Sequence, residues 1–331
     1  MKTFRSLRVL PIVLIAGQTY LAAADKLRME KAVDAMASVF SVIVYGENET
    51  RMEEALDAAL GEARRLDRML SNYRSDSEWS AVNRYAAEAP VKVSPELFRL
   101  LSACVDYSSR SEGAFEISVG PLMKTWGFYK GTGNLPAPAE VKSSLEKVGY
   151  RYISLDAANQ TVRFAKKGVE LDPGGIGKGY AVDRMAEILK GKGVETALIS
   201  GGGSSIYAMG APPGESGWNV KVRDPRDETK TAIEVFLKNE SMSTSGSYEK
   251  FFMAEGRMYS HIMDPRTGYP AEGMIAVSVI APKTLDSEAW TKPVFILGRK
   301  WAAQHIPKGF RAVVCEDKPS GGSDQPCAWL Q

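Results

Sequence analysis

Two glycine-rich segments limit the possible folds of this chain more than any other feature. The first, LDPGGIGKGYAVDR at Leu171–Arg184, has the pattern of a strand, a tight turn and a helix that begins near Gly179. The second, LISGGGSSIYAMG at 198–210, places three consecutive glycines after an apolar strand. Each pattern predicts a strand that ends where the backbone can approach a ligand or another strand closely.

The same two segments are candidates for binding an anionic ligand. Free N–H groups at the start of a helix attract phosphate, and Lys178 adds a positive charge. The first segment is neither a Walker A loop nor a GxGxxG motif, so the motif alone is weakly specific. A structural interpretation stays open beside it: a glycine-rich turn with a surface lysine, followed by a bulge. Two such clusters near each other in sequence favour one shared ligand.

Hydrophobic periodicity predicts an α+β protein with substantial antiparallel sheet and no clear domain boundary. The segment 71–84 is polar, and we expect a loop whose Ser and Asp residues suit turns and helix caps. Helices are predicted at 52–70, at 94–113, at 139–149, after Gly179 and at 287–298. Strands are predicted at 38–46, twice within 152–165, and at 197–200, 218–225, 231–238, 241–247, 257–264, 274–282 and 310–317.

Residues 1–24 are typical of a secretory signal peptide. Basic residues precede a short apolar run, Val9–Gly17, and small residues provide a cleavage site after Ala24. The run is too short to span a membrane, and no cysteine follows it, so we expect neither a transmembrane span nor a lipid anchor. Removing this segment takes away three of the 42 basic residues and none of the 40 acidic ones. The mature chain is then nearly neutral, which argues against a nucleic-acid partner.

The chain has three cysteines. Cys104 lies in a helical pattern and is expected to be a buried small hydrophobe. Cys315 and Cys327 can pair in an oxidising compartment, but the sequence does not decide whether they do. No CxxC motif is present, which argues against zinc and iron–sulfur sites. We expect one domain over 25–315 and a loose tail over 316–331, because PSGGSDQP is poor in apolar residues.

Only two histidines occur, and the context of His261 makes it a candidate base. It lies in YSHIMDPRTGYP, and Asp264 follows three residues later, where a carboxylate can orient an imidazole. A structural role for His261 is the alternative. His305 has no such context and is expected to be a surface residue.

These segments together resemble the ApbE family of flavin transferases. Eight blocks occur in family order between Met36 and Gly298: MASVFSVIVYG, LSNYRSDSEWSAVN, GAFEISVGPLMKTWGF, LDPGGIGKGYAVDR, ALISGGGSSIYAMG, STSGSYEKFF, YSHIMDPRTGYP and SEAWTKPVFILG. The resemblance implies a single compact, T-fold-related domain of two α+β lobes with FAD between them. It also implies an exported, periplasmic FAD:protein FMN transferase. Such an enzyme uses Mg²⁺ to move FMN from FAD to a Ser or Thr hydroxyl of a target flavoprotein, and it releases AMP.

The resemblance also assigns roles to individual residues. His261 matches the catalytic base, with Asp264 as its support. Positions that match FAD contacts are Met36, Tyr73, Ala114, Phe115, Glu116, Asp172, Lys178 and Ile262. Positions that match metal ligands are Gly175, through its carbonyl, Glu288 and Thr291. The implied targets are envelope electron-transfer subunits or other envelope flavoproteins.

The chain departs from the family pattern at the metal. The family pattern A-D-A-x-x-T places Glu288 at the aspartate and Lys292 at the threonine, and an ammonium cannot ligate Mg²⁺. Glu116 likewise replaces a usual aspartate, and Pro293 is predicted to interrupt the helix. Two interpretations follow. Either Glu288, Thr291 and the Gly175 carbonyl still hold Mg²⁺, or Lys292 takes the place of the metal.

Three functions therefore remain in consideration. The first is an Mg²⁺-dependent flavin transferase. The second is a metal-independent FAD-binding protein that has lost the transfer activity. The third sets the resemblance aside and is a secreted binding protein with a glycine-rich sheet.

Overall fold

The computed structural model describes residues 26–317 and 327–330. The predicted signal peptide, residues 1–24, and most of the predicted loose tail lie outside these described residues. Within the described ranges no helix is both long enough and apolar enough to cross a membrane.

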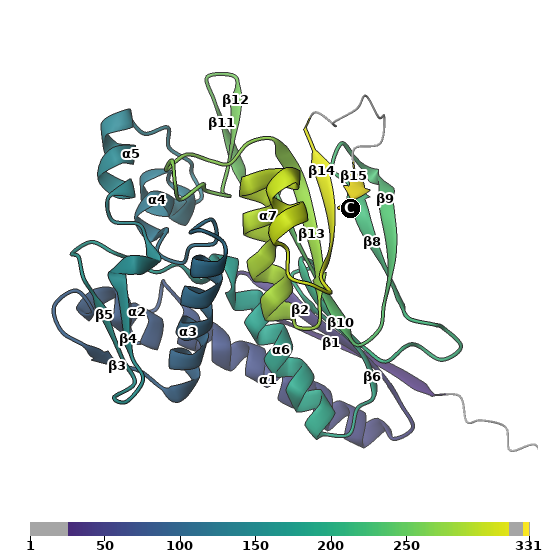
Figure 1. Ribbon diagram of the computed structural model, residues 1–331. Helices are drawn as coiled ribbons and strands as arrows, with labels where there is room; N and C mark the ends of the chain where they lie inside the picture. The colour runs from purple at the N-terminus through teal and green to yellow at the C-terminus, as the bar shows by residue number, and fades with distance from the viewer. Residues whose placement is uncertain (1–25, 318–326, 331) are drawn as a thin grey trace, which may run out of the picture.

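One large antiparallel sheet organises the molecule (Figure 1). Its strand order is β1-β2-β6-β7-β10-β13-β14-β15, and every neighbouring pair is antiparallel. The strands are β1 (Leu27–Ala35), β2 (Ser38–Gly46), β6 (Thr196–Gly201), β7 (Ser205–Met209), β10 (Glu240–Gly246), β13 (Met274–Ala281), β14 (Arg311–Glu316) and β15 (Cys327–Trp329). The predicted α+β class is confirmed, whereas β1 and β7 were not predicted.

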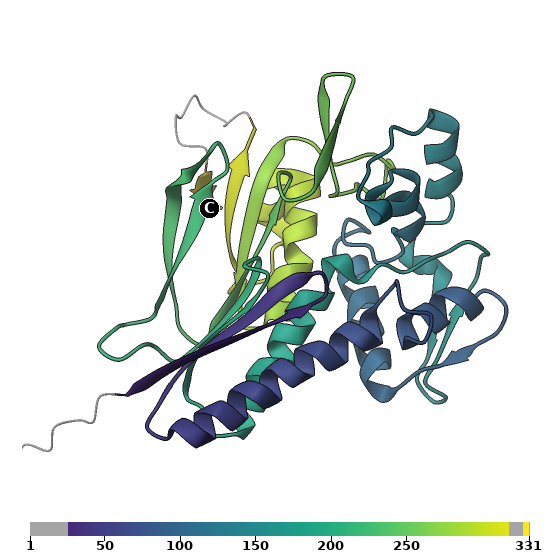
Figure 2. The same ribbon diagram turned by 180° about the vertical axis from the view of Figure 1, so that it is seen from behind.

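Three helices cover one face of the sheet, as the two views in Figures 1 and 2 show. They are α1 (Glu49–Leu70), α6 (Gly177–Gly191) and α7 (Thr284–His305). The Asn48 side chain caps α1 by accepting a hydrogen bond from the backbone N of Arg51. Apolar residues of α1 spaced three and four apart, such as Leu56 and Ala59, are fully buried. The helices and the sheet share one continuous hydrophobic core.

The opposite face of the sheet is covered by a long hairpin. It consists of β8 (Trp218–Asp224) and β9 (Asp227–Leu237). Trp218 and Leu237 of the hairpin pack with Met242 and Ile280 of the sheet in a second buried cluster. Both faces of the central strands are therefore buried.

A second group of elements lies beside α1 and α6, on the left in Figure 1. Its helices are α2 (Glu78–Tyr85), α3 (Pro95–Arg110), α4 (Gly120–Thr125) and α5 (Pro138–Leu145), with the 3-10 helices η1 (Phe128–Lys130) and η2 (Tyr150–Tyr152). Its small sheet has the order β3-β5-β4, formed by β3 (Val91–Lys92), β4 (Ile153–Asp156) and β5 (Thr161–Phe164). A separate hairpin, β11 (Phe251–Ala254) and β12 (Arg257–Ser260), projects from the molecule beside α7.

The structure corrects three local predictions. The segment 71–84 is not all loop, because α2 forms within it once the side chain of Ser77 caps the helix by accepting from the N of Ser80. Pro293 does not interrupt α7; the helix continues to a break at Gly298, which has φ 80°. The predicted tail is not loose at its end, since Cys327 forms a disulfide with Cys315 and begins β15.

Candidate functional site

A glycine-rich turn before α6 forms the centre of the candidate site. The Asp172 side chain caps the 3-10 helix η3 (Pro173–Gly175), with Oδ1 accepting from the N of Gly174 at 2.7 Å. The strand predicted before this turn is only an isolated β-bridge between Glu170 and Val119. The segment is held by α2, because Nε1 of the buried Trp79 donates to the carbonyl of Leu171 at 3.1 Å. Burial raises the pKa of the Asp172 carboxyl.

Lys178, in the first turn of α6, joins the two glycine clusters. Its Nζ donates a hydrogen bond to Oγ of Ser204 at 2.5 Å, and Ser204 follows the three glycines after β6. A Cβ on Gly202 would lie 3.7 Å from Cδ of Lys178. The two clusters therefore lie side by side, and their sharing of one ligand stays a prediction.

His261 follows β12 and is held by one backbone carbonyl. The Lys250 oxygen accepts from the backbone N of His261 at 2.9 Å and lies 3.0 Å from its Nδ1. Because a carbonyl only accepts, Nδ1 carries a proton, and Nε2 keeps a free lone pair. The ring also lies edge-on to Phe128, with centroids 6.4 Å apart.

The surroundings of His261 keep it neutral. Burial lowers the pKa of His261 to about 4. The hydrogen bond to the Lys250 carbonyl raises this pKa, whereas nearby positive charges lower it further. Those charges belong to the ammonium groups of Lys250, Lys292 and Lys178. A neutral imidazole with an available Nε2 can accept a proton at neutral pH.

Asp264 does not support His261, contrary to prediction. Its carboxylate binds the guanidinium of Arg266, with Oδ1 2.9 Å from Nε and Oδ2 2.7 Å from the Nη2 atom. The chain turns at this point, so the carboxylate two residues before Arg266 reaches that side chain more easily than the imidazole. The backbone carbonyl of Lys250 orients His261 instead.

Met36, Asn72 and Tyr73 lie at the other side of the glycine-rich turn. Met36 has a positive φ of 52°, and its Sδ lies 3.7 Å from the place where a Cβ on Gly177 would be. Tyr73 is 77% exposed, and its ring lies 6.2 Å from that of Tyr129. Nδ2 of Asn72 donates to Tyr129 and Asp172, while its buried Oδ1 has no donor among the described residues. An exposed aromatic face therefore lies beside an unused buried acceptor.

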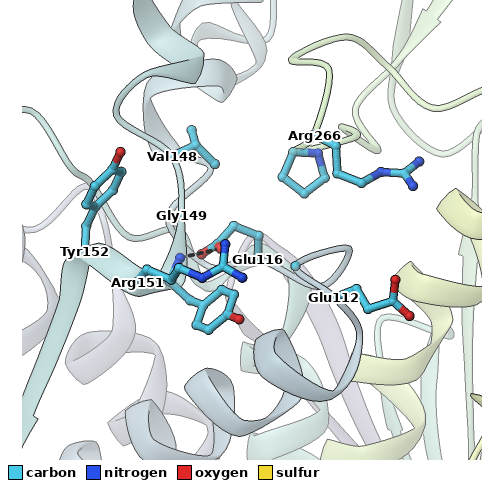
Figure 3. Close-up of a pocket in the computed structure, with 10 residues that line it drawn as sticks. Glu112, Glu116, Val148, Gly149, Arg151, Tyr152 and Arg266 are labelled. Carbon is cyan, nitrogen blue, oxygen red and sulfur yellow. Dashed lines mark hydrogen bonds between the residues drawn. The ribbon is translucent and has the colours of Figure 1, made fainter.

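Ala114, Phe115 and Glu116 are buried after α3, beside a cavity of about 290 Å³. Glu116 accepts hydrogen bonds from the N atoms of Ser118 and Tyr150, at 2.9 and 2.6 Å, so it braces the cavity wall. Burial raises the pKa of Glu116. Figure 3 shows the cavity between Tyr152 on one side and Arg266 on the other. Ile262 is buried next to His261.

The residues predicted to ligate Mg²⁺ do not fit a metal site. Oε2 of Glu288 accepts from the N of Gly179 at 2.5 Å, so this carboxylate caps α6. The fully buried hydroxyl of Thr291 donates to the Glu288 carbonyl at 2.7 Å and pairs with Ser245 at 2.8 Å. Within 26–317 and 327–330, no cluster of three His, Cys, Asp or Glu side chains is arranged to hold a metal ion. Oε2 of Glu288 and the Thr291 hydroxyl are therefore already hydrogen-bonded within the protein.

The predicted carbonyl ligand, Gly175, has an ammonium as its neighbour. A Cβ on Gly175 would lie 3.4 Å from Cε of Lys292, whose Nζ donates to the Glu288 carbonyl at 3.1 Å. Burial lowers the pKa of Lys292 to about 8, and the charge of Glu288 opposes this shift. Lys292 is therefore still mostly protonated at pH 7, and a positive charge stands where the resemblance places a metal.

Sequence reasoning missed Lys250, Asn72 and Tyr129 as site residues. Lys250 lies in a segment that was recognised as a block, but its role depends on a backbone carbonyl. Asn72 directly precedes Tyr73, and this adjacency was the available signal. His305 is exposed and stacks on Trp301, with centroids 4.5 Å apart, so its predicted surface position is confirmed.

A neutral imidazole near three ammonium groups, one of them in the glycine-rich segment, suits a phosphate-bearing ligand. The ApbE family profile matches residues 36–314. This chain belongs to the ApbE family.

Similar proteins agree with this assignment. The FAD:protein FMN transferase of Treponema pallidum is 34% identical over 259 residues, covering 74% of this chain and 71% of that protein. The transferase of the same name from Salmonella typhimurium is 29% identical, covering 84% and 81%. The ApbE protein of Thermotoga maritima superposes with a TM-score of 0.81 at 29% identity, covering 88% of this chain and 94% of that one. The flavinyl transferase ApbE of Pseudomonas stutzeri, in its apo form, has a TM-score of 0.77 at 27% identity, covering 92% and 94%.

Proposed function

We propose that this chain is a FAD:protein FMN transferase, which attaches FMN from FAD to a hydroxyl of a target flavoprotein. Family membership and the names of the similar proteins support this function. The observation that carries it is the neutral His261 beside the positive charges of Lys178, Lys250 and Lys292. This arrangement suits a reaction in which a hydroxyl loses a proton while a diphosphate is cleaved.

The residues present account for each requirement of the reaction. Nε2 of His261 accepts the proton of the target hydroxyl, because its lone pair is free and its pKa is low enough to keep it unprotonated. The glycine-rich turn and Lys178 bind the diphosphate. Tyr73 and Tyr129 offer aromatic faces to the flavin, and the cavity beside Glu116 takes part of the adenosine. We include no divalent cation, because Glu288 and Thr291 are engaged elsewhere.

The transferase activity is tested with the mature chain, FAD and a peptide that carries a candidate acceptor threonine. We expect release of AMP and an equal amount of peptide that carries FMN, measured by chromatography and mass spectrometry. FAD binding without either product would favour the metal-independent FAD-binding protein. Absence of FAD binding would rule out both flavin functions.

We further propose that the chain is exported to the periplasm and acts on envelope flavoproteins there, such as electron-transfer subunits. The basic and apolar pattern of residues 1–24 and the pairing of Cys315 with Cys327 support export. N-terminal sequencing of the native protein is expected to begin at Asp25. A cytoplasmic protein with an intact N-terminus would contradict the proposal.

A further inference from the structure

The first turns of α7 are fixed in one orientation against β10 and α6. Oγ of Ser287 lies 2.8 Å from that of Ser243, and the Thr291 hydroxyl pairs with Ser245. On the α6 side, a Cβ on Gly179 would lie 2.5 Å from the Thr284 carbonyl, so the two helices are in direct backbone contact. Lys292 therefore projects from a rigid element.

The Lys292 side chain extends to the glycine-rich turn before α6. The point where a Cβ on Gly175 would lie is 3.4 Å from Cε of Lys292 and 3.9 Å from Cε2 of Phe115. The residue thus meets both the glycine-rich turn and the segment that borders the cavity. Its ammonium has three N–H donors, of which the Glu288 carbonyl uses one, and its charge acts on His261.

The Lys292 ammonium forms no ion pair with a described residue, although the charge of Glu288 acts on it. Oε2 of Glu288 accepts a hydrogen bond from the N of Gly179. Among the described residues, no carboxylate forms an ion pair with Lys178, Lys250 or Lys292. An anionic ligand at the turn would therefore meet several ammonium groups that are not already held in ion pairs.

We propose that the Lys292 ammonium acts in place of a divalent cation, so that this enzyme binds the FAD diphosphate and transfers FMN without Mg²⁺. The inference rests on the proposed transferase function. In the transfer, the target hydroxyl oxygen forms a bond to the FMN-side phosphorus as the bond to the bridging oxygen breaks. The electron pair of that bond stays on the bridging oxygen, which leaves with AMP. The hydroxyl proton passes to Nε2 of His261, and Lys292 stabilises the charge on the departing phosphate.

The test uses mature chain freed of metal by chelation, with Mn²⁺ as a spectroscopic probe for Mg²⁺. We expect the same FAD dissociation constant and the same rate of AMP release with EDTA as with Mg²⁺. Electron paramagnetic resonance should show no Mn²⁺ bound to the protein–FAD complex. Replacing the ammonium by Lys292→Met should raise the dissociation constant for FAD about 10- to 100-fold, with or without Mg²⁺.

A double variant, Glu288→Asp with Lys292→Thr, provides the converse measurement. It supplies a shorter carboxylate and a hydroxyl instead of the ammonium, so it should acquire a Mn²⁺ signal and bind FAD more tightly with metal than with EDTA. Lys300→Thr removes an exposed lysine from the same helix and should behave as wild type.

The outcomes separate the inference from the proposed function. A wild-type protein that binds Mn²⁺ with FAD, or releases AMP only with Mg²⁺, overturns the inference and leaves the transferase function standing. A third outcome is a protein that binds FAD equally well with EDTA and loses affinity in Lys292→Met, but never transfers FMN. In that case Lys292 would still bind FAD in place of a metal. That last result overturns both the transferase function and the metal-free transfer step.

Discussion

Replacing His261 by asparagine is expected to lower the rate of FMN transfer by about 10²- to 10⁴-fold. Asparagine can still donate to the Lys250 carbonyl, but it has no nitrogen lone pair that accepts a proton at neutral pH. FAD binding should change little, because the glycine-rich turn and the lysines remain. The two quantities are measured separately, as AMP release and as the dissociation constant for FAD.

His305→Asn is the matched control, since it removes the other histidine from an exposed position. It should transfer FMN at the wild-type rate. If His261→Asn retained most of the wild-type activity, the proton would pass to another group. Loss of FAD binding in proportion to activity would instead indicate that His261 only binds.

The pH dependence of the transfer rate gives a second test of the role of His261. The transfer needs neutral His261, and its pKa is lowered to about 4. In wild type, kcat/KM for FAD should therefore stay constant from about pH 7 to about pH 5 and fall below that. It should also fall above about pH 8, where Lys292 loses its proton. An ordinary histidine would already lose activity around pH 6.5. Circular dichroism at each pH shows whether the fold is intact.

Replacing Trp79 by alanine is expected to lower the free energy of unfolding by about 3–5 kcal/mol. The indole is completely buried between α2 and the core, and its Nε1 donates to the Leu171 carbonyl. FAD affinity should also fall, because that carbonyl directly precedes Asp172 and the glycine-rich turn. Chemical denaturation gives the first quantity, and fluorescence titration of the folded variant gives the second.

Two variants of the same helix make this test specific. Trp79→Phe keeps an aromatic ring and loses the N–H, so it should cost only about 1–2 kcal/mol; Nδ2 of Asn83 still donates to Leu171. Tyr85→Ala removes an exposed aromatic and should change stability by less than about 0.5 kcal/mol. Equal losses in all three would mean that α2 responds to any substitution.

The sequence was a good guide where the local pattern and the fold agree. The strand at Ser38–Gly46 was predicted with its observed bounds, and the helix predicted at 94–113 is observed as α3, which Ser94 caps. The segment 71–84 misled because a short helix among Ser, Asp and Asn has little propensity of its own. It is stabilised by burial of Trp79 and Val82, which only the tertiary structure supplies.

The candidate site was likewise predictable from the sequence only in part. The approach of the two glycine clusters was predicted, although only the second cluster ends a strand, β6, and the first follows an isolated β-bridge at Glu170. The partner of Asp264 was not, because spacing along the chain cannot tell whether a carboxylate faces the imidazole before it or the guanidinium after it. The departure at Lys292 was visible in the sequence, but only the structure shows that Glu288 caps α6.

The pairing of β15 with β14 bears on the solubility of the protein before Cys315 and Cys327 are oxidised to the disulfide. β15 has only three residues, and the disulfide between Cys315 and Cys327 fastens it to the sheet. In a reducing environment this fastening is lost, and the outer N–H and C=O groups of β14 are left open to another chain. Such an edge favours self-association. Solubility of this enzyme is therefore expected to depend on the redox state in which it folds.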